Sequence, residues 1–427
     1  MQNTEKKKIV VYANYYYPEV ASLSQICTDL CTGLQKKFDV TVICAVPCYT
    51  GVIEEKYKKK KYYFEEYDGV KVIRVRVPFF DKKNKMSRVK HILGYFFRAM
   101  SATFKAPKAD YVFTVSQPPV LGGMLGVFGK RVNRLRGKKT KLIYNIQDYN
   151  PEQTIAVGYS KNKIALHAMA FLDKRTCKKA DKVIVVGRDM AETMQKRFTA
   201  KSGKLQKSMP KTAIINNWMD EREVYPLPDN DEKVIAFKKK YGLENKFVVM
   251  YSGNIGLFYD LEKLIEVIEQ FKNDSSVVFP FVGEGVLKSR LEEYVKEHNL
   301  KNVIFIPYQP KEELIYSLNA ASVHWVVNAK GIKGVSVPSK LYGVMAAGKP
   351  VLGVLEEGSE ARMIVEETGC GLVAAPCDYE KIAKLLKKFI TKEVDIAGMG
   401  ASGRAYLEKN LTKDVSLEKY VKEIEEC

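Results

Sequence analysis

The chain has 427 residues, of which 46% are hydrophobic and 28% charged, which excludes wholesale disorder and allows two domains of about 200 residues each. A formal net charge of +20 favours anionic partners such as nucleic acid, anionic lipid or nucleotide substrates. The N-terminus lacks an apolar signal-peptide core and no uncharged apolar run reaches about 18 residues, so neither a signal peptide nor a membrane-spanning helix is predicted.

Short β-branched runs alternate with amphipathic stretches in two successive series. The first series predicts a helix over 24–37 and strands over 8–13, 40–44, 70–77, 111–115, 141–146 and 182–186. The second series predicts strands over 247–251, 277–282, 303–306, 322–327, 350–354 and 371–374. This alternation indicates an α/β protein with parallel sheets in two Rossmann-like domains. We place these domains at 1–212 and 213–405, with a linker over 221–233 and a C-terminal helix within 406–427.

The segment 79–105 lies outside this alternation and combines large apolar residues with basic ones. Its apolar residues are Ile92, Leu93, Tyr95, Phe96, Phe97, Met100 and Phe104, and its basic residues are Lys82, Lys83, Lys85, Arg88, Lys90, Arg98 and Lys105. Such a helix is typical of proteins that lie among the headgroups of an anionic membrane, although a domain helix with core aromatics is the alternative. Residues 121–139 are a second candidate membrane-facing patch, and 196–211 is either a third or a solvated loop.

The segment 335–352 predicts a short helix aimed at an anion. Pro338 suits the first helical turn, and Gly348 ends the helix before the next strand. Ser339 and Lys340 then lie at the helix N-terminus, where backbone N–H groups and the helix dipole favour a phosphate. A helix that is only structural would not need the lysine.

This segment reads Pro-Ser-Lys, an aromatic and Met-Ala-Ala-Gly-Lys-Pro-Val. It resembles the signature of retaining GT-B glycosyltransferases of family 4. The resemblance is to the branch that builds capsule, O-antigen and colanic-acid-type polysaccharides, and within it to the L-fucosamine transferases of the WbuB group. Other matching motifs occur in the same order and span nearly the whole chain. They are Tyr17-Pro18-Glu19, residues 147–152, residues 217–220, residues 251–256 and residues 282–285.

The resemblance implies two Rossmann-like domains that face each other across a cleft, with the acceptor held by the first and the nucleotide sugar by the second. It also implies that the last helix packs back on the first domain. No bound cofactor is implied. The eight cysteines form no Cys-x-x-Cys pair, and Asp229-Asn230-Asp231 lies in the predicted linker, so we expect reduced thiols and no metal.

Several residues of the second domain are candidates for holding the donor. Lys340 and Ser339 would neutralise the diphosphate, whose charge grows as it leaves. Strand ends rich in glycine let the backbone approach a phosphate closely, although a simple tight turn is equally compatible. The resemblance also implies that one region approaches the nucleotide. It further implies an acidic residue that either binds the ribose hydroxyls or caps its own helix. The strand-end and resemblance-based candidates are Gly253, Asn254, Gly256, Gly283, Glu284, Lys288 and Glu360.

In the first domain, two carboxylates follow the strand 141–146. Asp148 or Glu152 could orient the acceptor hydroxyl or accept its proton, whereas an aspartate that caps the next helix is the alternative for Asp148. In relatives, the loop after the first strand lies beside the donor diphosphate and the acceptor. In this chain that loop contains Pro18, Glu19, Ser22 and Ser24.

The chain departs from the family pattern at five positions. Asn254 and Tyr259 stand where many members have an Arg/Lys pair, and Val335 and Gly343 stand where many have Glu-x7-Glu. Gln147 replaces a frequent His. These departures put the donor contacts and the choice of sugar in doubt and leave an inactive paralogue open.

The predicted function is transfer of a sugar from a UDP donor to a polyprenyl-diphosphate-linked glycan, at the cytoplasmic face of a bacterial membrane. The sugar expected is an N-acetylated hexosamine or deoxy-hexosamine. One alternative is a sugar-nucleotide 2-epimerase, which also pairs two Rossmann domains. Another is a non-enzymatic nucleic-acid-binding protein, suggested by charge alone, although the chain has no evident nucleic-acid-binding module.

Overall fold

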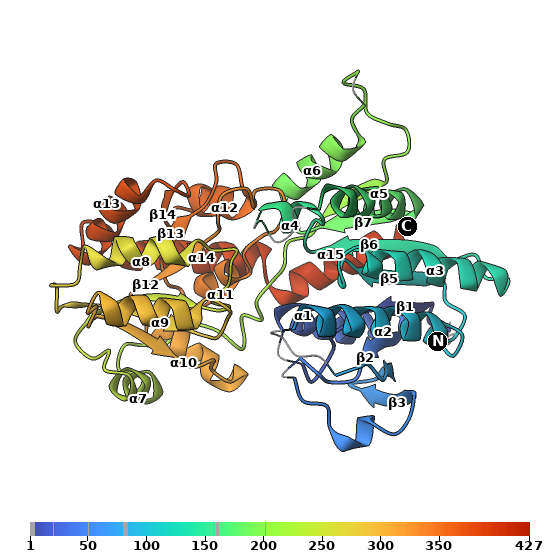
Figure 1. The fold of residues 1–427 in the computed structure, drawn as a ribbon, viewed down its shortest axis with the longest axis horizontal. Helices are drawn as coiled ribbons and strands as arrows, with labels where there is room; N and C mark the ends of the chain where they lie inside the picture. Colours follow the sequence, from blue (N-terminus) through green and yellow to red (C-terminus); the bar gives the residue numbers. More distant parts are fainter. Residues whose placement is uncertain are drawn as a thin grey trace. The chain divides into compact units, whose positions relative to one another are not determined.

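The computed structural model describes residues 5–19, 21–49, 51–79, 84–156, 158, 162–200 and 202–427. The chain divides into two compact units, shown in Figure 1. The first unit is Met1–Ile155, Ser160–Asn216 and Ser416–Cys427, and the second is Ala156–Tyr159 and Asn217–Val415. The boundary between the units thus falls after residue 216, four residues after the expected boundary at 212. The second unit ends at residue 415, ten residues after its expected end at 405.

The first unit is built on an eight-stranded sheet with the order β3-β4-β2-β1-β5-β6-β7-β8. Its strands are β1 (Lys8–Tyr12), β2 (Asp39–Ala45), β3 (Tyr62–Tyr67), β4 (Val70–Val75), β5 (Tyr111–Val115), β6 (Lys141–Ile146), β7 (Lys182–Val185) and β8 (Lys211–Ile214). All neighbours are parallel except β3 and β4, which are antiparallel. The two edge strands β3 and β8 were not predicted, because neither is a buried β-branched run: β3 lacks β-branched residues, and no residue of β8 is buried.

The helices of the first unit are α1 (Ser22–Leu34), η1 (Glu55–Tyr57), α2 (Lys85–Thr103), α3 (Leu121–Leu135), α4 (Glu152–Ala156), α5 (Lys163–Lys179) and α6 (Arg188–Phe198), with α15 (Lys413–Glu425) added from the C-terminus. α15 joins this unit through Tyr420, whose hydroxyl accepts a hydrogen bond from Asn145 Nδ2 at 3.1 Å, and through Glu423, which pairs with Lys182 at 2.5 Å. The last helix, predicted within 406–427, is therefore α15, and residues 406–410 belong to the preceding helix α14.

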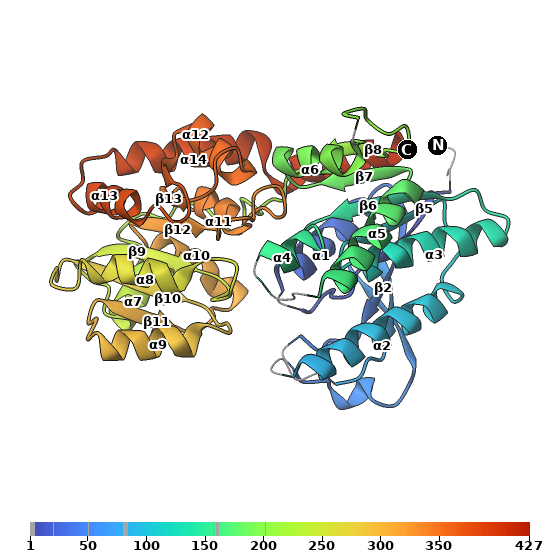
Figure 2. The ribbon, with the colours of Figure 1, turned by 45° about the horizontal axis from the view of Figure 1, so that its top comes forward.

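The helix α2 has two different faces. Tyr95 and Ala99 are buried in a core cluster with Val10, Val112 and Leu125 of the sheet and α3. Figure 2 shows α2 and α3 covering the same sheet. The opposite face exposes large apolar side chains at helical spacing, namely Met86, Val89, Leu93, Phe97 and Phe104. The alternative of a domain helix with core aromatics is thus correct for the buried face, whereas the membrane assignment stays a prediction. Lys82 and Lys83 lie outside the described residues.

The apolar part of the second predicted membrane patch is core instead. In α3 the residues Gly122, Leu125 and Val132 are buried, because they pack against the sheet. The basic end of this helix and Leu135, which is 89% exposed, reach the surface, and Leu121, Met124, Val127 and Phe128 are half-buried. Among the described residues, no helix combines the length and the apolar character needed to cross a bilayer.

The second unit has a six-stranded parallel sheet with the order β11-β10-β9-β12-β13-β14. Its strands are β9 (Phe247–Ser252), β10 (Val277–Val282), β11 (Val303–Ile306), β12 (Val323–Val327), β13 (Val351–Val354) and β14 (Gly371–Ala374). Its helices are α7 (Glu232–Lys240), α8 (Leu261–Glu269), α9 (Lys288–Glu297), η2 (Lys311–Glu313), α10 (Leu314–Asn319), α11 (Lys340–Ala346), α12 (Glu360–Thr368), α13 (Tyr379–Ile390) and α14 (Ile396–Asn410).

Alternate residues of the central strand β9 enter two separate cores. Val249 and Tyr251 belong to one hydrophobic cluster, and Val248 and Met250 belong to another. The sheet is therefore buried on both faces, as the doubly wound pattern predicts. The Asp-Asn-Asp run of the predicted linker begins α7, because Asp231 accepts hydrogen bonds from the N–H groups of Lys233 and Val234 as an N-cap.

A buried histidine makes the stability of the second unit depend on pH. His324 of β12 is fully buried, and its Nε2 lies 2.9 Å from the Leu318 carbonyl oxygen. Burial lowers the pKa of His324 to about 4, whereas the unfolded chain has a value of about 6.5. Between these values the unfolded state binds the proton and the folded state does not, so stability falls as the pH falls.

We predict that His324→Gln, which keeps an N–H donor but does not titrate, reduces the loss of unfolding free energy between pH 6.5 and pH 4. Across that pH range, the substitution should save up to about 3 kcal/mol of the unfolding free energy that the wild type loses. Urea unfolding at stepped pH measures it. The control His167→Gln, at an exposed position, should keep the wild-type slope. Equal slopes for wild type and His324→Gln would contradict the prediction.

Candidate functional site

Two glycine loops meet at the carboxyl ends of β9 and β10. The N–H of Gly253 donates to the Val282 carbonyl at 2.8 Å, and the N–H of Ile255 donates to the Glu284 carbonyl at 2.9 Å. A Cβ at Gly283 would lie 2.1 Å from the Gly253 carbonyl oxygen, and both glycines have φ near +140°. Only glycine fits at these positions. Ligands of open parallel sheets bind beyond this edge.

Lys340 lies across this glycine loop. A Cβ at Gly253 would come within 2.6 Å of the Lys340 Cε, and the Nζ lies 3.6 Å from the ring centroid of Tyr259 and 5.2 Å from that of Tyr251. Within the described residues, Lys340 forms no ion pair with a carboxylate. Its ammonium is thus held by aromatic faces and keeps its N–H donors available for an anion.

The helix around Lys340 differs slightly from the prediction. α11 begins at Lys340 with Ser339 at the N-cap, and Gly348 with φ +61° follows its end, as expected. The predicted donor contact Asn254 is exposed on the same loop, with Gly256 two residues further on. Four predicted donor residues, namely Gly253, Asn254, Gly283 and Lys340, are therefore gathered at one edge of the sheet.

The other predicted donor residues have protein partners. Glu284 and Lys288 form an ion pair of 2.7 Å, so the lysine's charge is balanced. Glu360 is buried in the first turn of α12 and is only 3% exposed. Glu356, which sequence reasoning missed, accepts hydrogen bonds from the N–H groups of Gly331 and Lys333 and so fixes the loop after β12. No sequence motif marks that role.

In the first unit, Asp148 follows the carboxyl end of β6 and is partly exposed. Its N–H and that of Gln147 both donate to the Ser116 hydroxyl, at 3.3 and 3.1 Å. Because Ser116 follows β5, this hydroxyl fixes the Asp148 backbone at the edge of the sheet where ligands bind. Asp148 is thus positioned for the predicted acceptor role, which stays a prediction.

Glu152 is engaged by Arg197 of α6. The guanidinium Nε donates to Glu152 Oε1 at 2.8 Å, Nη2 donates to Oε2, and Nη1 pairs with Asp173 at 2.5 Å. It also lies 4.1 Å from the ring centroid of Tyr149. Burial raises the pKa of Asp173, and Arg197 opposes this shift. Glu152 therefore anchors the turn after Asp148, whereas its predicted catalytic role would require it to exchange this partner.

The loop after β1 is tied to the loop after β2. Glu19 Oε1 accepts hydrogen bonds from the N–H groups of Cys48 and Tyr49 at 2.5 and 2.9 Å. Burial raises the pKa of Glu19, and these two N–H groups oppose the shift. Pro18 precedes it, and Ser22 begins α1. The Ser24 hydroxyl is buried with no hydrogen-bond partner among the described residues.

Both units match models of known domain families. Residues 23–205 match the glycosyl transferase 4-like domain, and residues 234–410 match the glycosyl transferases group 1. The chain belongs to the GT-B glycosyltransferases. The family and the α/β fold expected from the motifs are thus confirmed, while the narrower assignment to the WbuB group stays a prediction.

Individual relatives agree with this family. The chain is 29% identical over 347 residues to a probable glycosyltransferase WbjE of Pseudomonas aeruginosa, covering 80% of this chain and 82% of the relative. It is 27% identical over 432 residues to a putative colanic acid biosynthesis glycosyl transferase WcaI of Escherichia coli, covering 98% and 99%.

Solved structures share the fold at low sequence identity. Sucrose-phosphate synthase of Thermosynechococcus elongatus has a TM-score of 0.75 at 15% identity and covers 99% of both chains. Anabaena HepE in complex with UDP-glucose has a TM-score of 0.68 at 14% identity, covering 99% of this chain and 100% of HepE. At such identities the likeness shows the fold alone.

We predict that Gly283→Ala destabilises the glycosyltransferase by on the order of 2 kcal/mol or more, because a Cβ would meet the Gly253 carbonyl and φ is positive. Gly256→Ala is the matched control, because its Cβ would meet only the mobile amide end of Asn254. Urea unfolding compares the two variants. Equal stability of both would show that the two loops are not held as tightly as their geometry indicates.

Proposed function

We propose that this glycosyltransferase is retaining and moves a sugar from a UDP-sugar to a polyprenyl-diphosphate-linked glycan in bacterial surface polysaccharide biosynthesis. The proposed sugar is an N-acetylated hexosamine or deoxy-hexosamine. The observation that carries the proposal is Lys340, a cation held on aromatic faces beside the glycine loops. HepE and a trehalose-6-phosphate enzyme, whose structures contain UDP or UDP-sugars, and WcaI, named for colanic acid biosynthesis, support it.

The proposed chemistry follows from the charge that develops on the leaving group. As the bond between the anomeric carbon and the UDP oxygen breaks, negative charge grows on the diphosphate, and the Lys340 ammonium stabilises it. The acceptor oxygen forms its bond to the anomeric carbon on the same face, and its proton passes to the leaving diphosphate. Asp148 orients the acceptor hydroxyl. Neither a covalent nucleophile nor a metal ion is part of the proposal.

The proposal includes an anionic membrane surface at the cytoplasmic face. The exposed apolar stripe of α2 supports it, because Val89, Leu93 and Phe97 are 48%, 41% and 61% exposed. The exposed cations Arg88, Lys90 and Lys105 lie on or directly after the same helix. An apolar face flanked by cations is typical of helices that lie in the plane of an anionic bilayer.

We predict that Lys340→Gln lowers UDP release by about a hundredfold or more, in line with the loss of one preorganised charge contact. Purified protein is incubated with a panel of UDP-sugars and bacterial lipid extract, and released UDP is measured. Lys301→Gln, an exposed lysine just before β11, is the matched control. Unchanged turnover in Lys340→Gln would refute the role of Lys340. A donor sugar that changes configuration without UDP release would favour the epimerase.

We predict that the double variant Leu93→Ser and Phe97→Ser weakens binding to vesicles of anionic phospholipid by about tenfold or more, because two exposed apolar side chains no longer enter the bilayer. Co-sedimentation with anionic and zwitterionic vesicles measures it. The control Ile235→Ser and Val286→Ser removes exposed apolar side chains from the second unit. Equal binding by both double variants would contradict the assignment of the membrane surface to α2.

A further inference from the structure

The first unit contains an apolar pocket that none of the roles above uses. Its volume is about 400 Å³, within the range of about 300–1,000 Å³ for small-molecule sites. Its apolar lining consists of Val52, Ile53, Tyr57, Val77 and Phe79. Val52 and Phe79 are 69% and 63% exposed, so apolar side chains face solvent beside the pocket.

The walls of this pocket are firmly held. Tyr57 of η1 is buried, and its hydroxyl donates to Glu65 Oε1 of β3 at 2.8 Å. Arg76 Nη1 donates to the Lys58 carbonyl at 2.7 Å, which joins the segment after β4 to the segment after η1. Val77 is only 4% exposed. The pocket is therefore built from elements fixed to the sheet rather than from a single surface loop.

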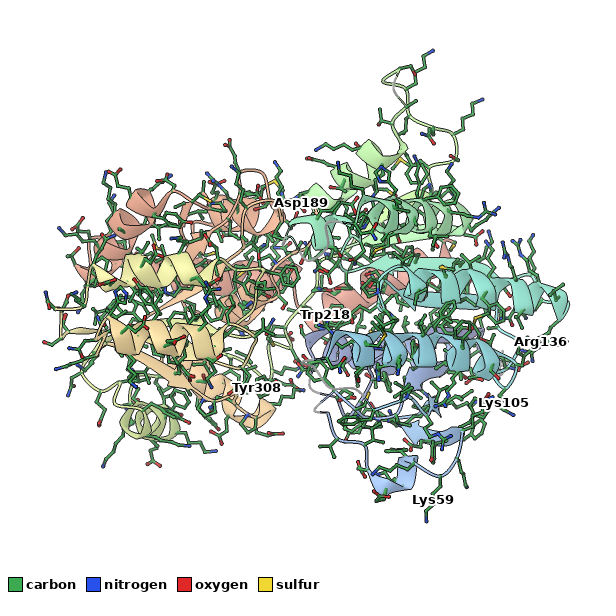
Figure 3. The ribbon with its side chains drawn as sticks, in the orientation of Figure 1. Lys59, Lys105, Arg136, Asp189, Trp218 and Tyr308 are labelled. Carbon is green, nitrogen blue, oxygen red and sulfur yellow. The ribbon has the colours of Figure 1, made fainter. Side chains whose placement is uncertain are left out.

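Two cations line the same pocket, Arg76 and Lys58, of which Lys58 forms an ion pair with Glu55. Lys59, Lys60 and Lys61 continue an exposed basic run after Lys58, and Figure 3 labels Lys59.

Arg98 of α2 lies behind the pocket wall, where it donates a hydrogen bond to the carbonyl of the lining residue Arg76. Burial and the nearby charge of Arg76 lower the pKa of Arg98. In the part of the chain that the structure describes, neither arginine forms an ion pair with a carboxylate. Two neighbouring guanidinium groups without a carboxylate favour an anion.

The pocket lies at the ligand-binding edge of the sheet. Gly51–Tyr57 follow β2, and Arg76–Phe79 follow β4, so both segments leave the carboxyl ends of parallel strands. Arg74 of β4 donates to the Tyr17 carbonyl at 2.6 Å, which ties β4 to the loop that carries Glu19. From β4 to β6 the sheet order spans four strand spacings, about 19 Å. Asp148 and the pocket therefore lie on one edge, well separated.

We infer that this pocket binds the isoprenyl-diphosphate end of the acceptor, with isoprene units against Val52, Val77 and Phe79 and the diphosphate at Arg76. The inference rests on the proposed function, because it gives the lipid end of that acceptor a site. The ligand is amphiphilic, as the site is: an apolar cavity rimmed by cations. Its separation from Asp148 leaves room along the sheet edge for the first sugars of the glycan.

The test is a titration of the full-length protein with farnesyl diphosphate, a short isoprenyl diphosphate, in saturating UDP so that the donor site is filled. We expect farnesyl diphosphate to bind at least about tenfold more tightly than inorganic diphosphate or farnesol. Arg76→Gln and Val52→Asp should each weaken it by about tenfold or more, and Arg76→Lys by less. Arg131→Gln and Val286→Asp are matched controls at exposed positions elsewhere.

The inference is overturned if Arg76→Gln and Val52→Asp leave the affinity for farnesyl diphosphate unchanged. So would inorganic diphosphate that binds as tightly as farnesyl diphosphate, because the apolar pocket would then contribute nothing. The proposed function fails separately. If wild-type protein releases no UDP from any donor but the titration gives the expected pattern, the lipid site stands and the transfer reaction does not.

Discussion

The close approach of two backbone loops in the second unit sets the geometry on which its candidate site depends. The Gly253 carbonyl lies where a Cβ of any other residue at position 283 would have to be, and the N–H of Gly253 is bonded to the end of β10. Because Gly253 has no side chain, the Lys340 side chain can lie against the backbone of this loop. Tyr259 then fixes the ammonium by its ring face instead of by a carboxylate. The cation is thus placed without being neutralised, which a site for a leaving diphosphate requires.

This arrangement also bears on the two positions where the family resemblance implies an Arg/Lys pair. Asn254 and Tyr259 stand there in this chain, and the ring of Tyr259 holds Lys340, which is not a member of that pair. A cation–π contact is worth about 0.5–2 kcal/mol, less than the interaction of a lysine with a diphosphate in a site shielded from water. The donor can therefore draw Lys340 away from the ring at small cost. The loss of a charged residue at position 259 is consistent with a working site.

Much of the fold could be predicted from sequence, because its dominant signal is local. The strands Tyr111–Val115, Lys141–Ile146 and Val277–Val282 have the predicted ends, since each is a buried β-branched or aromatic run with polar boundaries. The edge strand β3, with the sequence Tyr-Tyr-Phe-Glu-Glu-Tyr, carries no such pattern and is held by its pairing with β4. The partners of the site residues were harder to predict where they lie far away in the sequence. The Arg197 that engages Glu152 lies 45 residues away in sequence, and no spacing rule connects them.

That contact changes how the acceptor side of the site is understood. From sequence, Asp148 and Glu152 are two equivalent carboxylates on one loop. In the structure Glu152 is held by a guanidinium that also binds Asp173, and removing one partner from such a partly buried network leaves an uncompensated charge. The Asp148 N–H donates a hydrogen bond to the Ser116 hydroxyl, which fixes the backbone of this residue at the edge of the sheet. The two carboxylates therefore have different positions in the site. Glu152 and Arg197 keep the turn rigid, and Asp148 lies at the edge of the sheet. A rigid turn matters for transfer, because an acceptor hydroxyl misplaced by about 1 Å costs on the order of a hundredfold in rate.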